Sequence, residues 1–473
     1  MQNSFPKSFV NKTILVYIFG LFCLSIFFTN YIMNIEWLFA GIVSVVCFFY
    51  FSNTLPRKWA KLSTKKFTKQ LFWYIVLFRF LWMFIFYGYT MLVWNTPWEM
   101  PAHLPLDSPG YFNWGNDVFN YIKRGELIKM FSDTLNGVGQ LDDLGYPICL
   151  GLVRTLFGDS ILATRFVNPF FDAWAAVLLY RLATRNFGEN VGRLSAVFIM
   201  LMPIVFYYSG ITMKESVMVM FCVWFLERTD FMIRDKKISI KNIISPLLLV
   251  GSLFFFRSSL ALVAIMSLLG AILFTHGKVI GWQKRILIAF FVISVASVIF
   301  GGYMIEQMEQ TLVQREYAGE MNLQHRAERG NKLAGRLSEI VFAPIIFTIP
   351  FPTMVHIEDQ PIQQLTGGGY YIKNILSFFC ILSMFLLLRK SQWRKYAVSI
   401  LFMCGYLVVV AFSPFAHSGR FHMPAVPMEL MFAAFAVCNI TKKQAKWFDY
   451  FLVLEFLIII FWNLFKLAGR EII

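Results

Sequence analysis

Long apolar runs, separated by short polar turns, recur through almost the whole chain. Hydrophobic residues make up 58% of its 473 positions and charged residues only 15%, whereas about a quarter of a soluble domain is charged. A backbone in lipid must satisfy its own hydrogen bonds, so only helices or closed barrels cross a membrane. The runs are continuous rather than alternating, which excludes a barrel. The sequence therefore predicts an all-α, polytopic transmembrane helical bundle.

Hydropathy predicts about 13 spans in a single integral membrane domain, 1–473. The expected spans are 13–33, 37–52, 71–94, 161–183, 191–208, 217–226, 243–256, 258–275, 285–304, 372–388, 396–412, 423–440 and 448–466. Two other apolar segments, 146–158 and 340–353, are too short or too rich in proline to cross. We expect the first to form a re-entrant or interfacial helix ending at Gly158, and the second to dip into the membrane.

The basic residues orient the chain. Although the net charge is +16, the positive residues lie in short loops between apolar runs, a pattern of membrane orientation rather than of nucleic-acid binding. The densest of these loops, 56–69, is expected in the cytoplasm. Segments 95–160 and 305–370 then become two large extracytoplasmic loops that carry interfacial helices. The expected location is a bacterial inner membrane, with the active site on the extracytoplasmic face and membrane lipids as neighbours.

The first of these loops contains LPLDSPGYFNWGNDVFNYIKRG, residues 104–125, where polarity returns directly after a span. Its aromatic residues and Pro109 predict an interfacial helix that holds Asp107 at the lipid–water boundary. Asp107 has two interpretations that are compatible: a helix N-cap, or a charged general base.

A second acid, Glu215, lies beside Lys214 at the outer mouth of the span 217–226. It either joins Asp107 in one outward-facing cavity or simply starts a helix, where the helix dipole favours an acid. Four cations are expected at outer helix ends: Arg165, Lys214, Arg257 and Arg420. Arg257 and Arg420 have no acid nearby in the sequence, and arginine suits bidentate phosphate binding, so a lipid-linked phosphate is the expected ligand.

Histidine and intramembrane charges are less informative. Five of the six histidines fall outside by this topology, without the spacing of a metal site, so neither a metal nor a cofactor is expected: His103, His325, His356, His417 and His422. Arg79 and Asp172 fall at similar depths in neighbouring spans, and we interpret them as a structural ion pair.

Three segments together resemble the glycosyltransferase-C superfamily, in its protein O-mannosyltransferase and aminoarabinose-transferase branch. The first is DSPGYFNWGNDVFNYIKRGEL, which is similar to the family's Asp-x-x-x-Tyr element. The others are 146–216, with a proline-containing loop helix, an arginine in the next helix and an acid after LMPIVFYYSG, and GRFHMPAVPMELMFAA near the end. Two departures are that Ser108 follows Asp107 where the family often has a second acid, and that Phe421 replaces a tyrosine.

The resemblance implies an inverting glycosyltransferase that moves a sugar from a polyprenyl-phosphate-linked donor to an acceptor hydroxyl on an envelope glycan, lipid or protein. Asp107 would be the catalytic base, because one carboxylate suffices when a phosphate leaves as an anion. Substrate-binding roles would fall to Tyr111, Arg165, Lys214, Glu215, Arg257 and Arg420. One alternative is an O-antigen-type polysaccharide polymerase or ligase that uses 315–336 and His325. The other is a lipid or sugar transporter or flippase, which predicts repeated halves that the sequence lacks.

Overall fold

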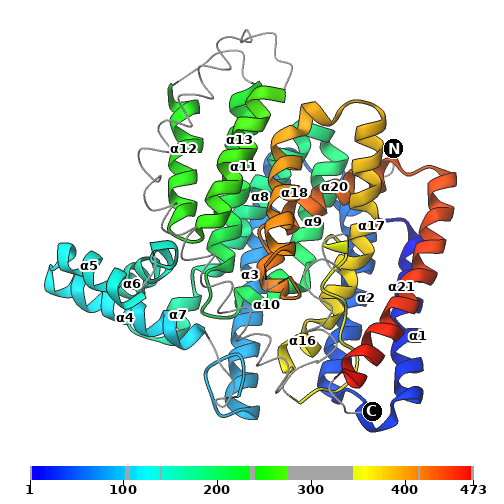
Figure 1. Ribbon diagram of the computed structural model, residues 1–473, viewed down its shortest axis with the longest axis horizontal. Helices are drawn as coiled ribbons and strands as arrows, with labels where there is room; N and C mark the ends of the chain where they lie inside the picture. Colours follow the sequence, from blue (N-terminus) through cyan, green and yellow to red (C-terminus); the bar gives the residue numbers. More distant parts are fainter. Residues whose placement is uncertain are drawn as a thin grey trace.

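The computed structural model describes residues 3–101, 107–138, 141–234, 240–274, 345–358, 360–413 and 416–469, and every regular element within these ranges is a helix (Figure 1). The predicted all-α class is therefore confirmed. Six of the described helices are long and apolar enough to cross a membrane, or seven if the bent pair α9–α10 counts as one span. The count of 13 is not confirmed, and the expected span 285–304 lies outside the described residues.

Five helices form the centre of the bundle and pack against one another. Apolar side chains surround most of them, and a helix that is apolar all round is a buried helix. They are α8 (Asn168–Phe187), α9 (Glu189–Leu201), α11 (Glu215–Arg234), α17 (Gly367–Arg389) and α20 (Val426–Asn439). The expected span 217–226 is thus extended at both ends as α11.

The outer helices present apolar side chains outward. Leu15 and Phe22 on one helix and Tyr450 and Phe461 on another are more than half exposed, as expected for surfaces that face lipid. Helix α1 (Lys7–Phe27) packs against α2 (Ile35–Trp59) and α21 (Lys442–Ala468), and α3 (Thr64–Val93) packs against α8. Helix α13 (Ser258–Phe274) packs against α12 (Ile240–Phe254) and α18 (Ala397–Ala411), the last preceded by the short turn η4 (Trp393–Tyr396).

Two expected spans are broken, each just before a proline. Residues 161–183 form α7 (Ile161–Arg165) and α8, since Pro169 has no N–H to donate to the carbonyl of Arg165. Residues 191–208 form α9 and α10 (Pro203–Ser209), which are bent by 53°. Each segment was predicted as a single helix, and this is corrected.

Arg79 supplies hydrogen bonds to the backbone at the break between α9 and α10. Its Nη2 donates to the carbonyl oxygens of Ile199 and Met200, 3.4 and 3.2 Å away. Pro203 has no N–H for the carbonyl of Ile199, and the carbonyl of Met200 lies in the last turn of α9, where the helix ends. Its Nε lies 3.3 Å from Asp172 Oδ2. The predicted Arg79–Asp172 ion pair is confirmed.

The first loop forms an arm of three helices that projects from the bundle: α4 (Ser108–Arg124), α5 (Leu127–Val138) and α6 (Gly145–Phe157) (Figure 1). Helices α4 and α6 cross closely at Gly115 and Gly151, because a Cβ at Gly151 would lie 2.2 Å from Val118. The helix expected over 146–158 is present as α6, and its C-cap is Gly158.

Residues 345–358, here called the strap, run without a helix between polar side chains of α17 and α21. Lys373 Nζ donates to the carbonyls of Phe347 and Ile349, and Asn463 accepts from Met354 N at 2.8 Å. These side chains replace the helical hydrogen bonds that a proline-rich backbone cannot make. The expected dip at 340–353 is described only from residue 345 and is an irregular, largely buried segment there. It continues into α16 (Pro361–Leu365).

Candidate active site

One guanidinium joins both predicted acids. Arg420, in the short helix α19 (Gly419–His422), donates through Nη1 to Asp107 Oδ2 and through Nε to Glu215 Oε1. These three residues, here called the triad, are separated by 313 and 205 positions in the chain. The prediction that Asp107 and Glu215 lie close together is confirmed. Arg420 has no acid nearby in the sequence, and both of its acidic partners come from distant segments.

The three side chains of the triad differ in their exposure to solvent. The exposed fraction of the side chain falls from 59% for Asp107 through 16% for Arg420 to 0% for Glu215. Burial alone would lower the pKa of Arg420, but the charges of Glu215 and Asp107 raise it well above its ordinary value. Arg420 therefore stays a cation, and the carboxylate with access to solvent is Asp107.

Asp107 occupies the N-cap position of α4 but makes no side-chain capping bond. Its carbonyl accepts the first helical bond, from Tyr111 N at 3.1 Å, while its carboxylate turns to Arg420. The interpretation of Asp107 as a capping side chain is therefore wrong, and the interpretation as a general base stays a proposal.

Glu99 is an acid of this region that the sequence analysis missed. It is only 3% exposed, and its Oε1 accepts from Ser108 Oγ at 2.6 Å, immediately next to Asp107. Burial raises the pKa of Glu99, and the hydrogen bond from Ser108 offsets part of that effect. The available signal was a single acid within the apolar stretch TPWEMP, directly before the polar loop.

Lys214 and Tyr111 converge on Asp143, in the turn η2 (Leu141–Asp143). Lys214 Nζ donates to Asp143 Oδ1 and to the carbonyl of Phe256 (2.7 Å), and Tyr111 Oη donates to the same carboxylate at 2.9 Å. Burial alone would raise the pKa of Asp143, but Lys214 holds it below its ordinary value. Lys214 and Tyr111 are about 95% buried and hold this turn, and their roles in substrate binding stay predictions.

Arg257 lies in the turn between α12 and α13, which docks on the arm through a bond from Gly145 N to the Phe255 carbonyl. Its Nη1 donates to Tyr406 Oη at 2.7 Å, and its guanidinium lies 4.5 Å from the ring centre of Phe421. Arg420 lies 5.8 Å from that same ring. The structure therefore brings the two predicted phosphate-binding arginines together, and within the described ranges Arg257 forms no ion pair.

Arg165 is the remaining cation that was predicted to bind substrate. It has no exposed surface, and it donates to the carbonyl of Pro97 (2.6 Å) and to Thr212 Oγ1 (3.3 Å). These bonds tie the segment before α4 to the loop that presents Lys214 and Glu215. Arg165 thus holds two parts of the site together, and its role in substrate binding stays a prediction.

The histidines do not form a metal site among the described residues. His422 is buried and bonds the carbonyl of Ala416 at 2.8 Å, which shapes the turn that carries Arg420. Within the described part of the chain, no three His, Cys, Asp or Glu side chains gather as a metal site would require. His103, His325 and the basic segment 315–336 lie outside the described residues.

The model of one protein family, dolichyl-phosphate-mannose-protein mannosyltransferase, matches residues 144–300. The resemblance to the glycosyltransferase-C superfamily is confirmed. The match covers about a third of the chain and includes Arg165, Lys214, Glu215 and Arg257, but neither Asp107 nor Arg420. This family implies an integral membrane glycosyltransferase. No curated protein and no solved structure matches the chain.

Proposed function

We propose that this glycosyltransferase moves a sugar from a polyprenyl-phosphate-linked donor to an acceptor hydroxyl, with inversion, on the extracytoplasmic face of the membrane. The observation that carries the proposal is the contact of Arg420 with both Asp107 and Glu215. In this contact a solvent-accessible carboxylate lies next to a permanent cation, where the starts of α4 and α11 meet the short helix α19. Such a pair suits a reaction in which a proton leaves one reactant and negative charge develops on the other.

In the proposed reaction, Asp107 accepts the proton of the acceptor hydroxyl as that oxygen attacks the anomeric carbon. The new bond joins the acceptor oxygen to this carbon, and the bond from the carbon to the phosphate oxygen breaks. The lipid phosphate leaves with the electron pair, so cations rather than a general acid serve it. Glu215 binds Arg420 from the buried side, so the part of the guanidinium next to Asp107 can contact a bound substrate.

Arg257 is the better candidate for the donor phosphate. The guanidinium of Arg420 already binds two carboxylates, whereas that of Arg257 contacts a tyrosine hydroxyl and an aromatic face. A buried arginine that forms no ion pair with a described residue attracts a phosphate anion strongly. The ring of Phe421 lies against both arginines, so a phosphate bound by Arg257 would lie close to the triad.

The experiment is mass spectrometry of cell-envelope glycans, lipids and proteins after deletion of the gene, with complementation by wild-type and Asp107→Asn chains. We expect one sugar to be lost from an envelope molecule, restored by the wild type and not by the variant. An unchanged set of glycoconjugates in the deletion strain would overturn the proposal. Restoration by Asp107→Asn would leave a transferase with a different base.

A further inference from the structure

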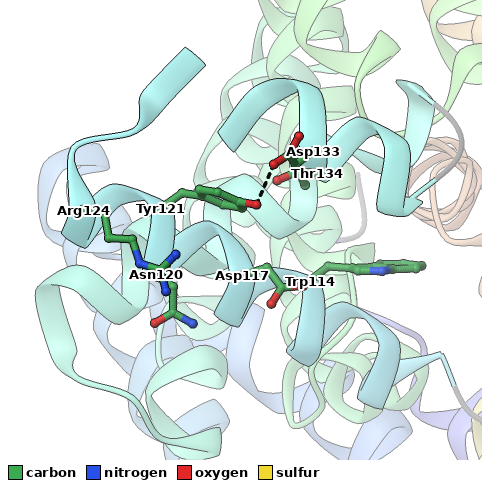
Figure 2. Close-up of a pocket in the computed structure, with 7 residues that line it drawn as sticks. All are labelled: Trp114, Asp117, Asn120, Tyr121, Arg124, Asp133 and Thr134. Atoms are coloured by element: carbon green, nitrogen blue, oxygen red, sulfur yellow. Dashed lines mark hydrogen bonds between the residues drawn. The ribbon is translucent and has the colours of Figure 1, made fainter. Parts of the chain in front are cut away.

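A pocket lies on the arm between α4 and α5, away from the triad (Figure 2). Five of its lining residues come from successive turns of α4 and two from α5: Trp114, Asp117, Asn120, Tyr121, Arg124, Asp133 and Thr134. Its volume is about 180 Å³, below the ~300–1,000 Å³ of pockets that enclose drug-sized ligands. This space suits one small polar unit rather than a lipid-linked donor.

The residues that line the pocket include both hydrogen-bond donors and acceptors, as recognition of hydroxyl groups requires. Carboxylates only accept hydrogen bonds, a guanidinium only donates, and an amide does both, so Asp133, Arg124 and Asn120 together match groups that donate and accept at once. The Tyr121 hydroxyl donates to Asp133 Oδ2 at 2.7 Å, which orients that carboxylate (Figure 2). Trp114 adds a flat apolar ring, against which the C–H face of a sugar can pack.

One polar atom of the pocket lacks a partner. Thr134 is 5% exposed, and its Oγ1 forms no hydrogen bond with any described residue. A buried hydroxyl without a partner destabilises the fold, and a ligand hydroxyl in the pocket would relieve that cost.

Aromatic packing connects the pocket to the candidate active site. The ring of Trp114 meets Tyr111 edge to face at 5.8 Å, and the Tyr111 hydroxyl binds Asp143, the partner of Lys214. Because a helix rises ~1.5 Å per residue, Trp114 and Tyr121 lie about 10 and 20 Å along α4 from Asp107. A ligand that fills the pocket and also reaches Asp107 must therefore be a chain of several small polar units.

We infer that the pocket binds an inner sugar of an oligosaccharide acceptor, whose terminal hydroxyl lies at Asp107. The charges favour a neutral acceptor over the donor phosphate here, because the two carboxylates of the pocket, Asp117 and Asp133, outnumber its one cation, Arg124. Saccharide binding rests on the pocket alone, and the word acceptor rests on the proposed function. The acceptor class is thereby narrowed from glycan, lipid or protein to a glycan.

The test uses the full chain in detergent and a panel of soluble probes: one- to five-unit oligosaccharides of glucose, mannose and N-acetylglucosamine. Binding is measured by saturation-transfer NMR and calorimetry for the wild type, for Trp114→Ala and for Asp133→Asn. Glu126→Gln is the matched control, an acid of the same arm that does not line the pocket. We expect a longer member of at least one series to bind more tightly than its monosaccharide.

Trp114→Ala and Asp133→Asn should each weaken that binding by about tenfold or more, and Glu126→Gln should leave it unchanged. Thermal unfolding checks that the variants are folded, and Asp133→Asn keeps the inference testable if Trp114→Ala is not. Failure of every probe to bind, or wild-type affinity in the folded pocket variants, would overturn the inference. Saccharide binding without any sugar transfer would refute the proposed function and leave the saccharide site standing.

Discussion

The buried charges around the strap and those of the triad differ in how fully their polar atoms are engaged. Lys466 Nζ donates to Thr353, Gln360 and Gln363, and Lys373 Nζ binds two strap carbonyls and lies 3.5 Å from Glu429. Both lysines are over 90% buried. In the triad, by contrast, one guanidinium serves two carboxylates, and one of these is 59% exposed.

Burying a charged side chain costs free energy, and this chain uses such side chains in two ways. A charge whose donors are all bound to protein, away from solvent, supports the backbone and has no capacity left for a ligand. A charge that reaches solvent and shares its partners can exchange one of them for a substrate. Variants at the strap should therefore change stability before activity, and variants at the triad should change activity before stability.

The largest effect is expected for Asp107→Asn. If Asp107 is the general base, its replacement by an amide removes the proton acceptor and should slow sugar transfer by ~10²–10⁴-fold. The melting temperature should stay close to that of the wild type, because the Asp107 side chain makes no capping bond and its ion pair with Arg420 lies at the exposed surface, where such pairs contribute little. Transfer assays and thermal unfolding in detergent give both values. A folded variant with wild-type turnover would remove Asp107 from the mechanism and favour the ligase reading.

Arg257→Ala should have the next largest effect, on the donor. A hydrogen bond to a charged group contributes about 1.5–3 kcal/mol, so donor affinity should fall by about 10- to 150-fold, with a smaller change for the acceptor. Titration with a polyprenyl-phosphate sugar measures the first value, and acceptor KM the second. Arg257→Lys is the matched control, since it keeps the charge but loses the planar fork, and it should be intermediate. Unchanged donor affinity in Arg257→Ala would exclude phosphate binding by this residue.

Arg420→Ala is expected to resemble Arg257→Ala in weakening the donor, with one difference that sharpens the comparison. It also leaves Glu215 buried without its cation, which costs stability. We therefore expect a lower melting temperature in Arg420→Ala than in Arg257→Ala. Equal melting temperatures would show that the Arg420–Glu215 pair contributes nothing to the fold.

Lys466→Met tests the strap. Three acceptors lose their donor, so unfolding should become easier by about 1–3 kcal/mol, seen as a lower melting temperature. The rate of transfer below that temperature should be unchanged. Lys12→Met is the control, because Lys12 pairs with Asp449 at the exposed surface, where such pairs contribute little. A transfer rate that falls in Lys466→Met without loss of stability would contradict the structural role assigned to the strap.

The sequence predicted the helices well and the contacts between distant helices poorly. Apolar runs, Pro109 and Gly158 mark ends of helices in the sequence itself, and α4 and α6 begin or end there. The breaks before Pro169 and Pro203 were also marked by a residue that lacks an N–H, but the runs continue across both prolines and were interpreted as single spans.

The composition of the site could be predicted only in part. Asp107, Glu215 and Arg420 were each identified by their place at a helix end, but the bridge between them depends on how helices over 200 positions apart pack together. The fully buried state of Arg165 and the presence of Glu99 depend on the irregular segment 94–101, which has no period from which burial could be predicted.

The smallest expected effect on sugar transfer is that of Glu99, which does not contact the substrate in the proposed reaction. We propose that it positions Asp107 by holding Ser108, the first residue of α4. Glu99→Gln keeps an acceptor for that hydroxyl and should transfer sugar at close to the wild-type rate. Glu99→Ala loses one hydrogen bond, worth about 0.5–1.5 kcal/mol, and should lower kcat by about 2- to 13-fold with little change in donor KM.

The pH dependence of stability provides an independent measurement on Glu99. Burial raises the pKa of its carboxyl above the ordinary value of 4.5, so the folded chain binds this proton more tightly than the unfolded chain does. The resulting stability is complete below pH 4.5 and is lost as the pH rises through the folded-state pKa. Glutamine does not titrate, so the melting temperature of Glu99→Gln minus that of the wild type should increase as the pH rises above 4.5. A difference that stays constant with pH would show that the carboxyl is solvated, and Glu99 would then belong to the surface of the arm rather than to the site.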